Sequence, residues 1–155
     1  MSYYNRLDAI AYAKKWALRR NDKYFNFDSI GGDCTNYVSQ CLYAGIGVMN
    51  YQKYGWYYNN GNDKAPAWTG VEHLYKFLIN NKSDGPKGID ISISTLNIGD
   101  IIQLSFDGVI YGHTLIITEL SDRVEEIKVC AHTIDSYNRK LGTYLYKKSR
   151  GIHIV

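Results

Sequence analysis

The sequence lacks the features that mark several large classes of protein. No run of Lys or Arg forms a nucleic-acid-binding stripe, and the formal net charge of the 155 residues is only +3, so we expect no nucleic-acid partner. No stretch approaches the roughly 20 apolar residues of a membrane-spanning helix, and no internal repeat or low-complexity segment is present. The remaining composition, 45% hydrophobic and 21% charged, is that of an ordinary globular protein. The length fits a single domain over 1–155.

The cysteines are few, and their spacing excludes several roles. There are three, an odd number that leaves at least one thiol free or intermolecular. Cys34 and Cys41 lie two helical turns apart, too far for a disulfide within one helix, and Cys130 lies in a strand-like run. Cys34 with Cys41, and Cys130 with His132, do not make two closely spaced pairs of zinc ligands. We therefore expect no disulfide framework, no metal and no other cofactor.

Residues 1–6 contain no apolar segment of the kind found in secretory signal peptides, so none is predicted. A domain cut from a longer exported or cell-wall-associated protein would also begin without such an apolar segment. The cellular location and the oligomeric state therefore stay open.

Apolar residues recur at helical spacing in the first half of the chain and alternate along short segments in the second half. Asn5 is the expected N-cap of the first helix, and Gly45 and Gly47 are expected to end the second. This order indicates an α+β fold, with N-terminal helices packed on one side of a C-terminal antiparallel sheet. The predicted helices cover 5–20, the segment from 35 to these glycines, and 71–80; the predicted strands cover 89–93, 101–106, 112–120, 124–133, 142–146 and 151–155.

The stretch around Cys34 is the best candidate for a reactive centre. It reads Gly-Gly-Asp-Cys-Thr-Asn-Tyr-Val-Ser-Gln-Cys over 31–41, so a thiol stands at the start of a nearly uncharged helix that should be buried. Unpaired backbone N–H groups and the positive end of the helix dipole favour thiolate over thiol there. We expect Asp33 to cap the helix through the N–H of Asn36 or Tyr37, with substrate binding as its alternative role.

Among the four histidines, His113 is the best candidate for a general base. His73 lies in a polar helix and His153 lies near the end of the chain, and both are expected to be surface or partly buried residues. His113 follows a glycine and begins an apolar strand, where a polar ring needs a partner. A histidine satisfied within the core is the alternative.

A short hairpin would bring His132 beside His113. If Asp122-Arg123 forms a two-residue loop, the two histidines lie directly opposite each other on adjacent strands, with Cβ atoms about 5 Å apart. The ring of His132 would then fix the tautomer of His113. A loop one residue longer would place a neighbour of His132 opposite instead.

These residues supply the parts of a cysteine hydrolase. Cys34 would attack a carbonyl carbon, while His113 would accept the thiol proton and later protonate the leaving amine. His132 would orient His113, and the N–H of Cys34 would contribute to an oxyanion hole.

The segment 50–68 is rich in aromatic residues and has no clear helical or strand period. Loops longer than about 12 to 15 residues are often functional in compact domains. Trp56, Tyr57 and Trp68 are therefore candidates for stacking on sugars or flat peptide groups of a substrate. The alternative is an aromatic satellite core beneath the loop.

These motifs resemble those of the bacterial "putative amidase domain" family, which is related to the NlpC-type and CHAP-type cell-wall cysteine hydrolases of the papain-like superfamily. The block at 31–41 is the most specific match, and the resemblance covers nearly the whole chain. The other matching pieces are Tyr4-Asn5-Arg6 with Ala9 and Tyr12-Ala13, Trp68, Ile98-Gly99-Asp100-Ile101-Ile102, Gly112-His113-Thr114, and His132-Thr133 with Asp135.

The resemblance implies a papain-like fold, in which a nucleophile helix packs against an antiparallel sheet that carries the histidine. It implies a cysteine amidase or peptidase that hydrolyses an amide bond in peptidoglycan or another peptide, with Cys34 as nucleophile and His113 as base. The third catalytic position varies among such relatives, so His132 depends on the register argument and Asp135 is the alternative. The scissile bond does not follow from the sequence.

Two other functions would use the same fold. A non-catalytic module would bind cell wall or glycan through 50–68, and Cys34→Ala would leave that binding intact. A papain-like acyltransferase would transfer the acyl group to an amine or alcohol, and product analysis would show transfer instead of hydrolysis.

Overall fold

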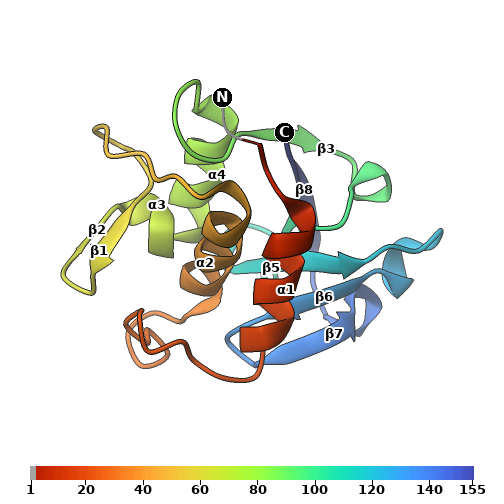
Figure 1. The fold of residues 1–155 in the computed structure, drawn as a ribbon. Helices are drawn as coiled ribbons and strands as arrows, with labels where there is room; N and C mark the ends of the chain where they lie inside the picture. The colour runs from red at the N-terminus through yellow and green to blue at the C-terminus, as the bar shows by residue number, and fades with distance from the viewer. Residues whose placement is uncertain (1–2) are drawn as a thin grey trace.

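The computed structural model describes residues 3–155, which form a mixed α/β structure with a six-stranded antiparallel sheet. Figure 1 shows α1 and α2 side by side against the sheet. The helices are α1 (Arg6–Trp16), α2 (Cys34–Ile46), α3 (Pro66–Thr69) and α4 (Val71–Asn80), with short 3₁₀ helices η1 (Ile93–Thr95), η2 (Val124–Glu126) and η3 (Leu141–Thr143). The strands are β1 (Tyr58–Asn60), β2 (Asp63–Lys64), β3 (Gly88–Ile91), β4 (Ile101–Ser105), β5 (His113–Glu119), β6 (Lys128–Ala131), β7 (Ser136–Lys140) and β8 (Lys148–Ile154). Within these residues, no helix is both long and apolar enough to cross a bilayer.

Helix α1 begins where the sequence predicts but ends earlier. The side-chain oxygen of Asn5 accepts a hydrogen bond from the N–H of Asp8 at 3.0 Å, which confirms Asn5 as the N-cap. The helix ends at Trp16 and not at Arg20, because the following residues form a turn in which the N–H of Arg19 reaches the carbonyl of Trp16. The turn releases Arg20 from the helix, and its side chain reaches the loops that flank α2.

Helix α2 is almost entirely buried, as its lack of charge predicts. Gly47 ends it in the left-handed region (φ 75°) and donates its N–H to the carbonyl of Tyr43 at 2.8 Å, so the predicted glycine stop is confirmed there. Gly45 lies inside the helix, contrary to expectation. A Cβ atom at Gly45 would lie 2.6 Å from the ring of Tyr4, so this glycine allows Tyr4 to pack against the helix.

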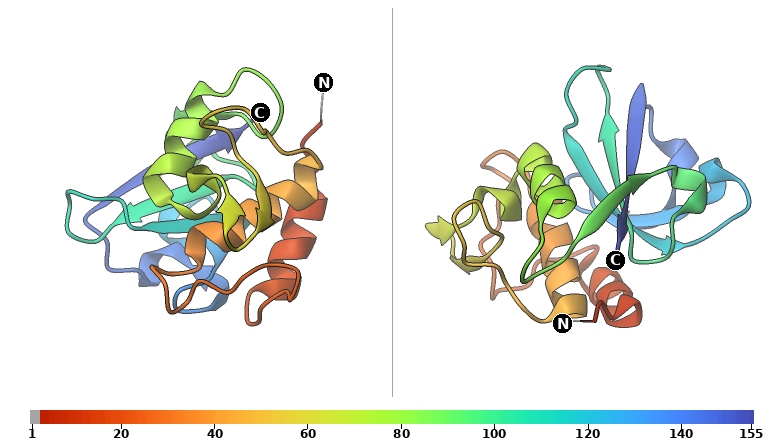
Figure 2. Two further views of the ribbon diagram at one scale, coloured as in Figure 1. Left: turned by 90° about the vertical axis from the view of Figure 1, so that its left-hand side faces the viewer. Right: turned by 90° about the horizontal axis from the view of Figure 1, so that it is seen from above.

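The large sheet has the order β3-β8-β4-β5-β6-β7, and every adjacent pair is antiparallel. Its side chains alternate between two cores. Ile101 and Ile116 pack with the helices, whereas Ile102 and Leu115 pack on the opposite face with residues of the C-terminal loops. The loop between β4 and β5 projects from the body of the molecule in both views of Figure 2.

Two of the predicted C-terminal strands are wrong in extent or position. The segment 124–133 contributes only the four residues of β6, since η2 occupies its start. After β6, Thr133 and Ile134 have φ angles of 59° and 53° and turn the chain into β7. The predicted strand 142–146 overlaps η3, and the strand that precedes it, β7, was not predicted.

The aromatic segment 50–68 has more local structure than its pattern indicates. It contains the hairpin of β1 and β2 and most of the short helix α3. Its tryptophans belong to the core between the helices and the sheet. Tertiary packing of these large rings, rather than any local period, therefore determines the conformation of this segment.

Candidate functional site

Cys34 is the first residue of α2, and its side chain is 7% exposed. The chain approaches it through Gly31 and Gly32, which have φ angles of 84° and 99°. Residues with a side chain rarely adopt these φ angles, so the two glycines permit the sharp turn into the helix. The turn also packs closely on the end of β6, since a Cβ atom at Gly32 would lie 3.2 Å from Oγ1 of Thr133.

The sulfur of Cys34 lies against the start of β5. Oγ1 of Thr35 lies 3.7 Å from it, and the backbone N–H of Thr114 acts to lower its pKa. The two threonine hydroxyls are themselves 2.9 Å apart, which joins the first turn of α2 to the strand. The candidate nucleophile is thus connected, through the hydroxyl of Thr35, to Thr114, the residue that directly follows His113.

Burial raises the pKa of the Cys34 thiol above its ordinary value. Hydrogen bonds from Thr114 and Thr35 act in the opposite direction, and the charge of Asp33 adds to the increase. Burial outweighs the hydrogen bonds, so the resting state is a thiol. The preference for thiolate that the helix terminus predicts is therefore wrong for this state.

His113 lies at the beginning of β5 with its ring between Phe106 and Tyr144, whose ring centroids are 6.1 and 5.8 Å from its own. Its Nε2 atom is buried and has no hydrogen-bond partner among residues 3–155. Burial, with a smaller effect of the charge of Arg139, lowers the pKa of His113 to about 4. The imidazole is therefore neutral at neutral pH. No hydrogen bond between described residues joins it to the sulfur of Cys34.

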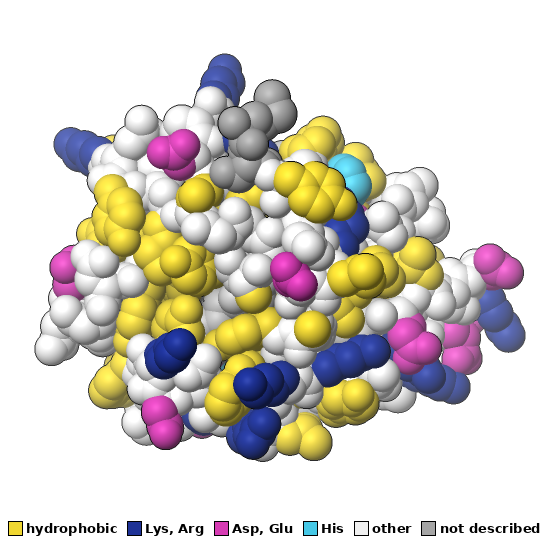
Figure 3. Space-filling model, in the orientation of Figure 1, with side chains coloured by type: hydrophobic (Ala, Val, Ile, Leu, Met, Phe, Trp, Pro, Cys, Tyr) yellow, Lys and Arg dark blue, Asp and Glu magenta, His cyan; other side chains and the backbone are white. Residues whose placement is uncertain are grey.

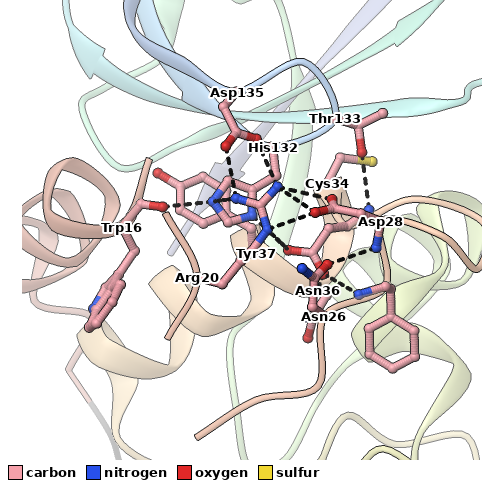
Figure 4. Close-up of polar contacts among 12 residues, drawn as sticks. Trp16, Arg20, Asn26, Asp28, Cys34, Asn36, Tyr37, His132, Thr133 and Asp135 are labelled. Carbon is pink, nitrogen blue, oxygen red and sulfur yellow. Dashed lines mark hydrogen bonds and ion pairs between the residues drawn. The ribbon is translucent and has the colours of Figure 1, made fainter. Parts of the chain in front are cut away.

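His132 lies just after β6 and is turned toward α1 and α2 (Figure 4). Its Nδ1 atom is 2.6 Å from Oδ2 of Asp33, and its Nε2 atom is 2.7 Å from the carbonyl oxygen of Trp16. The ring stacks on Tyr37, with centroids 3.9 Å apart and planes at 18°. Both ring nitrogens thus lie near acceptor oxygens, and Nε2 is also 3.2 Å from Nη1 of Arg20.

The predicted pairing of His113 with His132 is wrong. Strands β5 and β6 pair Ile116 with Cys130 and Ile117 with Val129. This register is shifted by one residue from the pairing that a two-residue loop at Asp122-Arg123 would produce. The connection also contains η2, and the register shifts again beyond Ile117. His132 therefore does not contact His113 and does not orient it.

Asp33 is buried, but it does not cap α2 through its side chain, contrary to expectation. Its Oδ1 atom accepts hydrogen bonds from the side chain of Asn36 and the N–H of Phe27, both at 2.9 Å. Burial acts to raise the pKa of Asp33, but hydrogen bonds from His132, Asn36 and Phe27 outweigh it and hold the pKa below its ordinary value. A carboxylate with these partners is a structural anchor and has no free oxygen for a substrate.

Arg20 completes this cluster and is the residue that the sequence analysis missed. It pairs with Asp28 and Asp135 through two hydrogen bonds to each, and it lies 3.6 Å from Asp33. Asp135 is therefore linked to His132 through the guanidinium group (Figure 4). No local signal marks Arg20, because its partner Asp135 lies 115 residues away in the sequence.

Trp56 and Trp68 have no exposed surface, so the prediction that they contact a substrate is wrong. Their ring centroids are 4.6 Å apart, and their indole N–H groups donate to Oγ of Ser39 and Oδ1 of Asn36. They form the aromatic core that the alternative interpretation predicts. Tyr57 is half-buried and stacks on Tyr51, with ring centroids 5.1 Å apart.

No group of three or more His, Cys, Asp or Glu side chains within 3–155 is arranged to hold a metal ion. The residues near Cys34 provide hydroxyl and backbone N–H groups, and the imidazole of His113 stands on the residue before Thr114. These groups suit nucleophilic and acid–base chemistry.

Comparison with known proteins places this site in a family. The family model described as "Putative amidase domain" matches residues 3–155. The chain belongs to this family. The family resemblance of the sequence motifs is thereby confirmed, and the description of this amidase family indicates hydrolysis of amide bonds.

A relative of this amidase-family chain is known from Bacillus subtilis (strain 168) under the name "Uncharacterized protein YhbB". The two sequences are 34% identical over 141 residues, which cover 88% of this chain and 43% of the relative. The chain thus spans less than half the length of that relative. No solved structure matches the present chain.

Proposed function

We propose that the protein is a cysteine amidohydrolase of papain-like type, related to the NlpC-type and CHAP-type enzymes, in which Cys34 is the nucleophile and His113 is the base. The observation that carries the proposal is a neutral imidazole whose buried Nε2 has no partner among residues 3–155, on the residue that precedes Thr114. The hydroxyl of Thr114 lies 2.9 Å from that of Thr35, whose Oγ1 is 3.7 Å from the sulfur. An unpartnered buried nitrogen is costly in a purely structural residue. It is expected where the nitrogen has a proton to accept.

In the proposed reaction the proton moves as the sulfur attacks. The raised pKa of Cys34 and the lowered pKa of His113 make a resting thiolate–imidazolium pair unfavourable. The sulfur therefore bonds to the amide carbon as Nε2 of His113 takes its proton, directly or through one water. Apo geometry often lengthens such contacts, and they tighten when substrate binds.

The tetrahedral intermediate then collapses. The C–N bond breaks, and His113 returns the proton to the leaving amine. Water hydrolyses the remaining thioester with His113 again acting as base, which releases the acid and restores the thiol. The N–H of Cys34 lies at the N-terminus of α2, where first-turn N–H groups have no helical partner and can stabilise the oxyanion.

Peptidoglycan is the proposed substrate, because the chain's motifs resemble those of cell-wall hydrolases. Its peptides contain amide bonds that one thiol and one imidazole are sufficient to cleave. The proposal assigns no role in the chemistry to His132 or Asp135, which serve to hold the turn that precedes Cys34.

Mass spectrometry of digested peptidoglycan tests this function. Wild-type protein is expected to release new amine and carboxylate ends, and Cys34→Ala is expected to release none. Cys41→Ala, checked for folding by circular dichroism, is the matched control because Cys41 is a fully buried thiol of the same helix. Identical digests from wild type and Cys34→Ala would exclude peptidoglycan hydrolysis, and wall binding without cleavage would indicate the non-catalytic module.

A further inference from the structure

A cavity of about 610 Å³ lies between the segment 50–55 and helix α4. Its lining includes the apolar side chains of Pro66 and Phe77 and the amide of Asn80, and it contains neither Cys34 nor any residue in contact with it. This volume is in the range that proteins use for small molecules and short peptide segments. The cavity is therefore large enough to be a binding site separate from the candidate active site.

Hydrogen bonds of Asn50 hold the two walls of this cavity together. Its side-chain N–H₂ group donates to Oγ of Ser83 and to the carbonyl of Asp84, both at 3.0 Å. Its Oδ1 atom accepts the N–H of Gln52 at 2.9 Å. A Cβ atom at Gly55 would lie only 2.2 Å from the carbonyl oxygen of Asn50, so glycine is required in this wall. The walls of the cavity are thus fixed by contacts within the protein, as those of most binding sites are.

The charged residues that line this cavity are all of one sign. Lys53, Lys76 and Lys82 line it together with His73, and no Asp or Glu does. None of the three ammonium groups donates a hydrogen bond or forms an ion pair within residues 3–155, whereas Glu72, the acid nearest to His73 in sequence, is paired with Arg150. Figure 3 shows Lys or Arg side chains that stand clear of the surface at the top of the view, with an Asp or Glu side chain between them. The ammonium group of Lys53 lies 5.4 Å from the ring centroid of Tyr54, but none of the three lysines has a carboxylate partner among residues 3–155. Three such cations around one cavity favour an anionic ligand.

We propose that this cavity binds an acidic peptide segment. The lysines would pair with its carboxylates, and Phe77 and Pro66 would cover its aliphatic carbon atoms. Among residues 3–155 the side-chain oxygen of Asn80 and the side-chain N–H₂ group of Gln52 make no hydrogen bond, so they can pair with the N–H and C=O groups of a peptide. An inorganic anion would use the lysines alone and leave the apolar wall uncovered. The proposal does not depend on catalysis by Cys34.

Calorimetric titration of the full chain carrying Cys34→Ala tests this site. Triglutamate is the probe, triglutamine is the neutral peptide of matched length, and inorganic phosphate is the simple anion. We expect triglutamate to bind at least about tenfold more tightly than triglutamine, because exposed ion pairs contribute up to about 1 kcal/mol each and 1.4 kcal/mol is tenfold. Combined Lys53→Gln, Lys76→Gln and Lys82→Gln should remove most of that difference.

A matched triple variant separates location from net charge. Lys23→Gln, Lys147→Gln and Lys148→Gln remove the same charge outside the cavity and should change the affinity less than about twofold. In ¹H–¹⁵N spectra, triglutamate should shift resonances of 50–55 and 73–83 and leave 32–37 unchanged. The proposal is overturned if triglutamate binds no more tightly than triglutamine or phosphate, if both triple variants weaken binding equally, or if the shifts fall on 32–37.

Discussion

The Nδ1 atom of His132 and the Oδ2 atom of Asp33 lie 2.6 Å apart, and both side chains are buried. This pair connects the end of β6 to the residue that immediately precedes Cys34. Since Oδ1 of Asp33 also accepts the N–H of Phe27, the same carboxylate holds the loop that precedes the glycine turn. The position of the sulfur thus depends on Asp33 and on the two segments that this carboxylate joins, the loop at Phe27 and the end of β6.

Removing the charge of Asp33 should therefore destabilise the fold. Asp33→Asn leaves His132 beside an amide in a buried site, and breaking a buried pair from one side typically costs about 3 to 5 kcal/mol. We expect a loss of about 3 kcal/mol or more in the free energy of unfolding, measured by urea denaturation. Asp135→Asn is the control, because its partly exposed pair with Arg20 should contribute about 1 kcal/mol or less. Equal losses in the two variants would contradict the anchoring role of Asp33.

The buried imidazole of His113 should make stability depend on pH. Its pKa falls from 6.5 to about 4 on folding, so the unfolded chain binds the proton more tightly. Stability is then fully present above pH 6.5 and decreases as the pH falls from there toward 4, by up to about 3 kcal/mol. Urea denaturation between pH 4 and 7 measures the slope. His113→Gln should flatten it, and an unchanged slope in that variant would assign the pH dependence to other groups.

Alkylation should reveal the resting state of Cys34. Iodoacetamide is expected to modify Cys34 before Cys41 and Cys130, because Cys34 is 7% exposed and the other two are fully buried. Since burial raises the pKa of the Cys34 thiol above 9.0, the rate should still be rising as the pH approaches 9. Peptide mapping by mass spectrometry from pH 6 to 9 measures the rate at each site. A plateau near neutral pH would show a resting thiolate and contradict the assigned pKa direction.

Local signals in the sequence predict the helices and the place of Cys34 well. The cap at Asn5, the stop at Gly47 and the limits of α4 all follow from patterns within a few residues. The register between β5 and β6 does not, because it depends on η2 and on the left-handed conformations of Thr133 and Ile134. No propensity predicts such angles in an isoleucine, a residue that rarely adopts them.

The sequence predicts the part of the site that depends on the packing of whole elements. Cys34 and Thr114 are brought together by the packing of α2 on β5, which the nucleophile motif and the apolar strand both indicate. The cluster of Asp33, His132 and Arg20 joins residues about 100 apart along the chain. Spacing rules reach only a few residues, so they assigned Asp33 to a local cap and missed Arg20 altogether.

The role of His113 can be separated from simple support of the fold. His113→Gln keeps a polar side chain of similar size but cannot accept the thiol proton and return it, so amide hydrolysis should fall by roughly 10² to 10⁴. The measurement is the rate of peptidoglycan or model-amide cleavage, made at a pH and temperature where circular dichroism shows both proteins folded. His153→Gln is the control, because His153 pairs with Asp100 at the start of β4 and contacts no part of the Cys34 site. If His113→Gln retains wild-type cleavage while Cys34→Ala abolishes it, another group must take the thiol proton, and the unpartnered Nε2 loses its catalytic explanation.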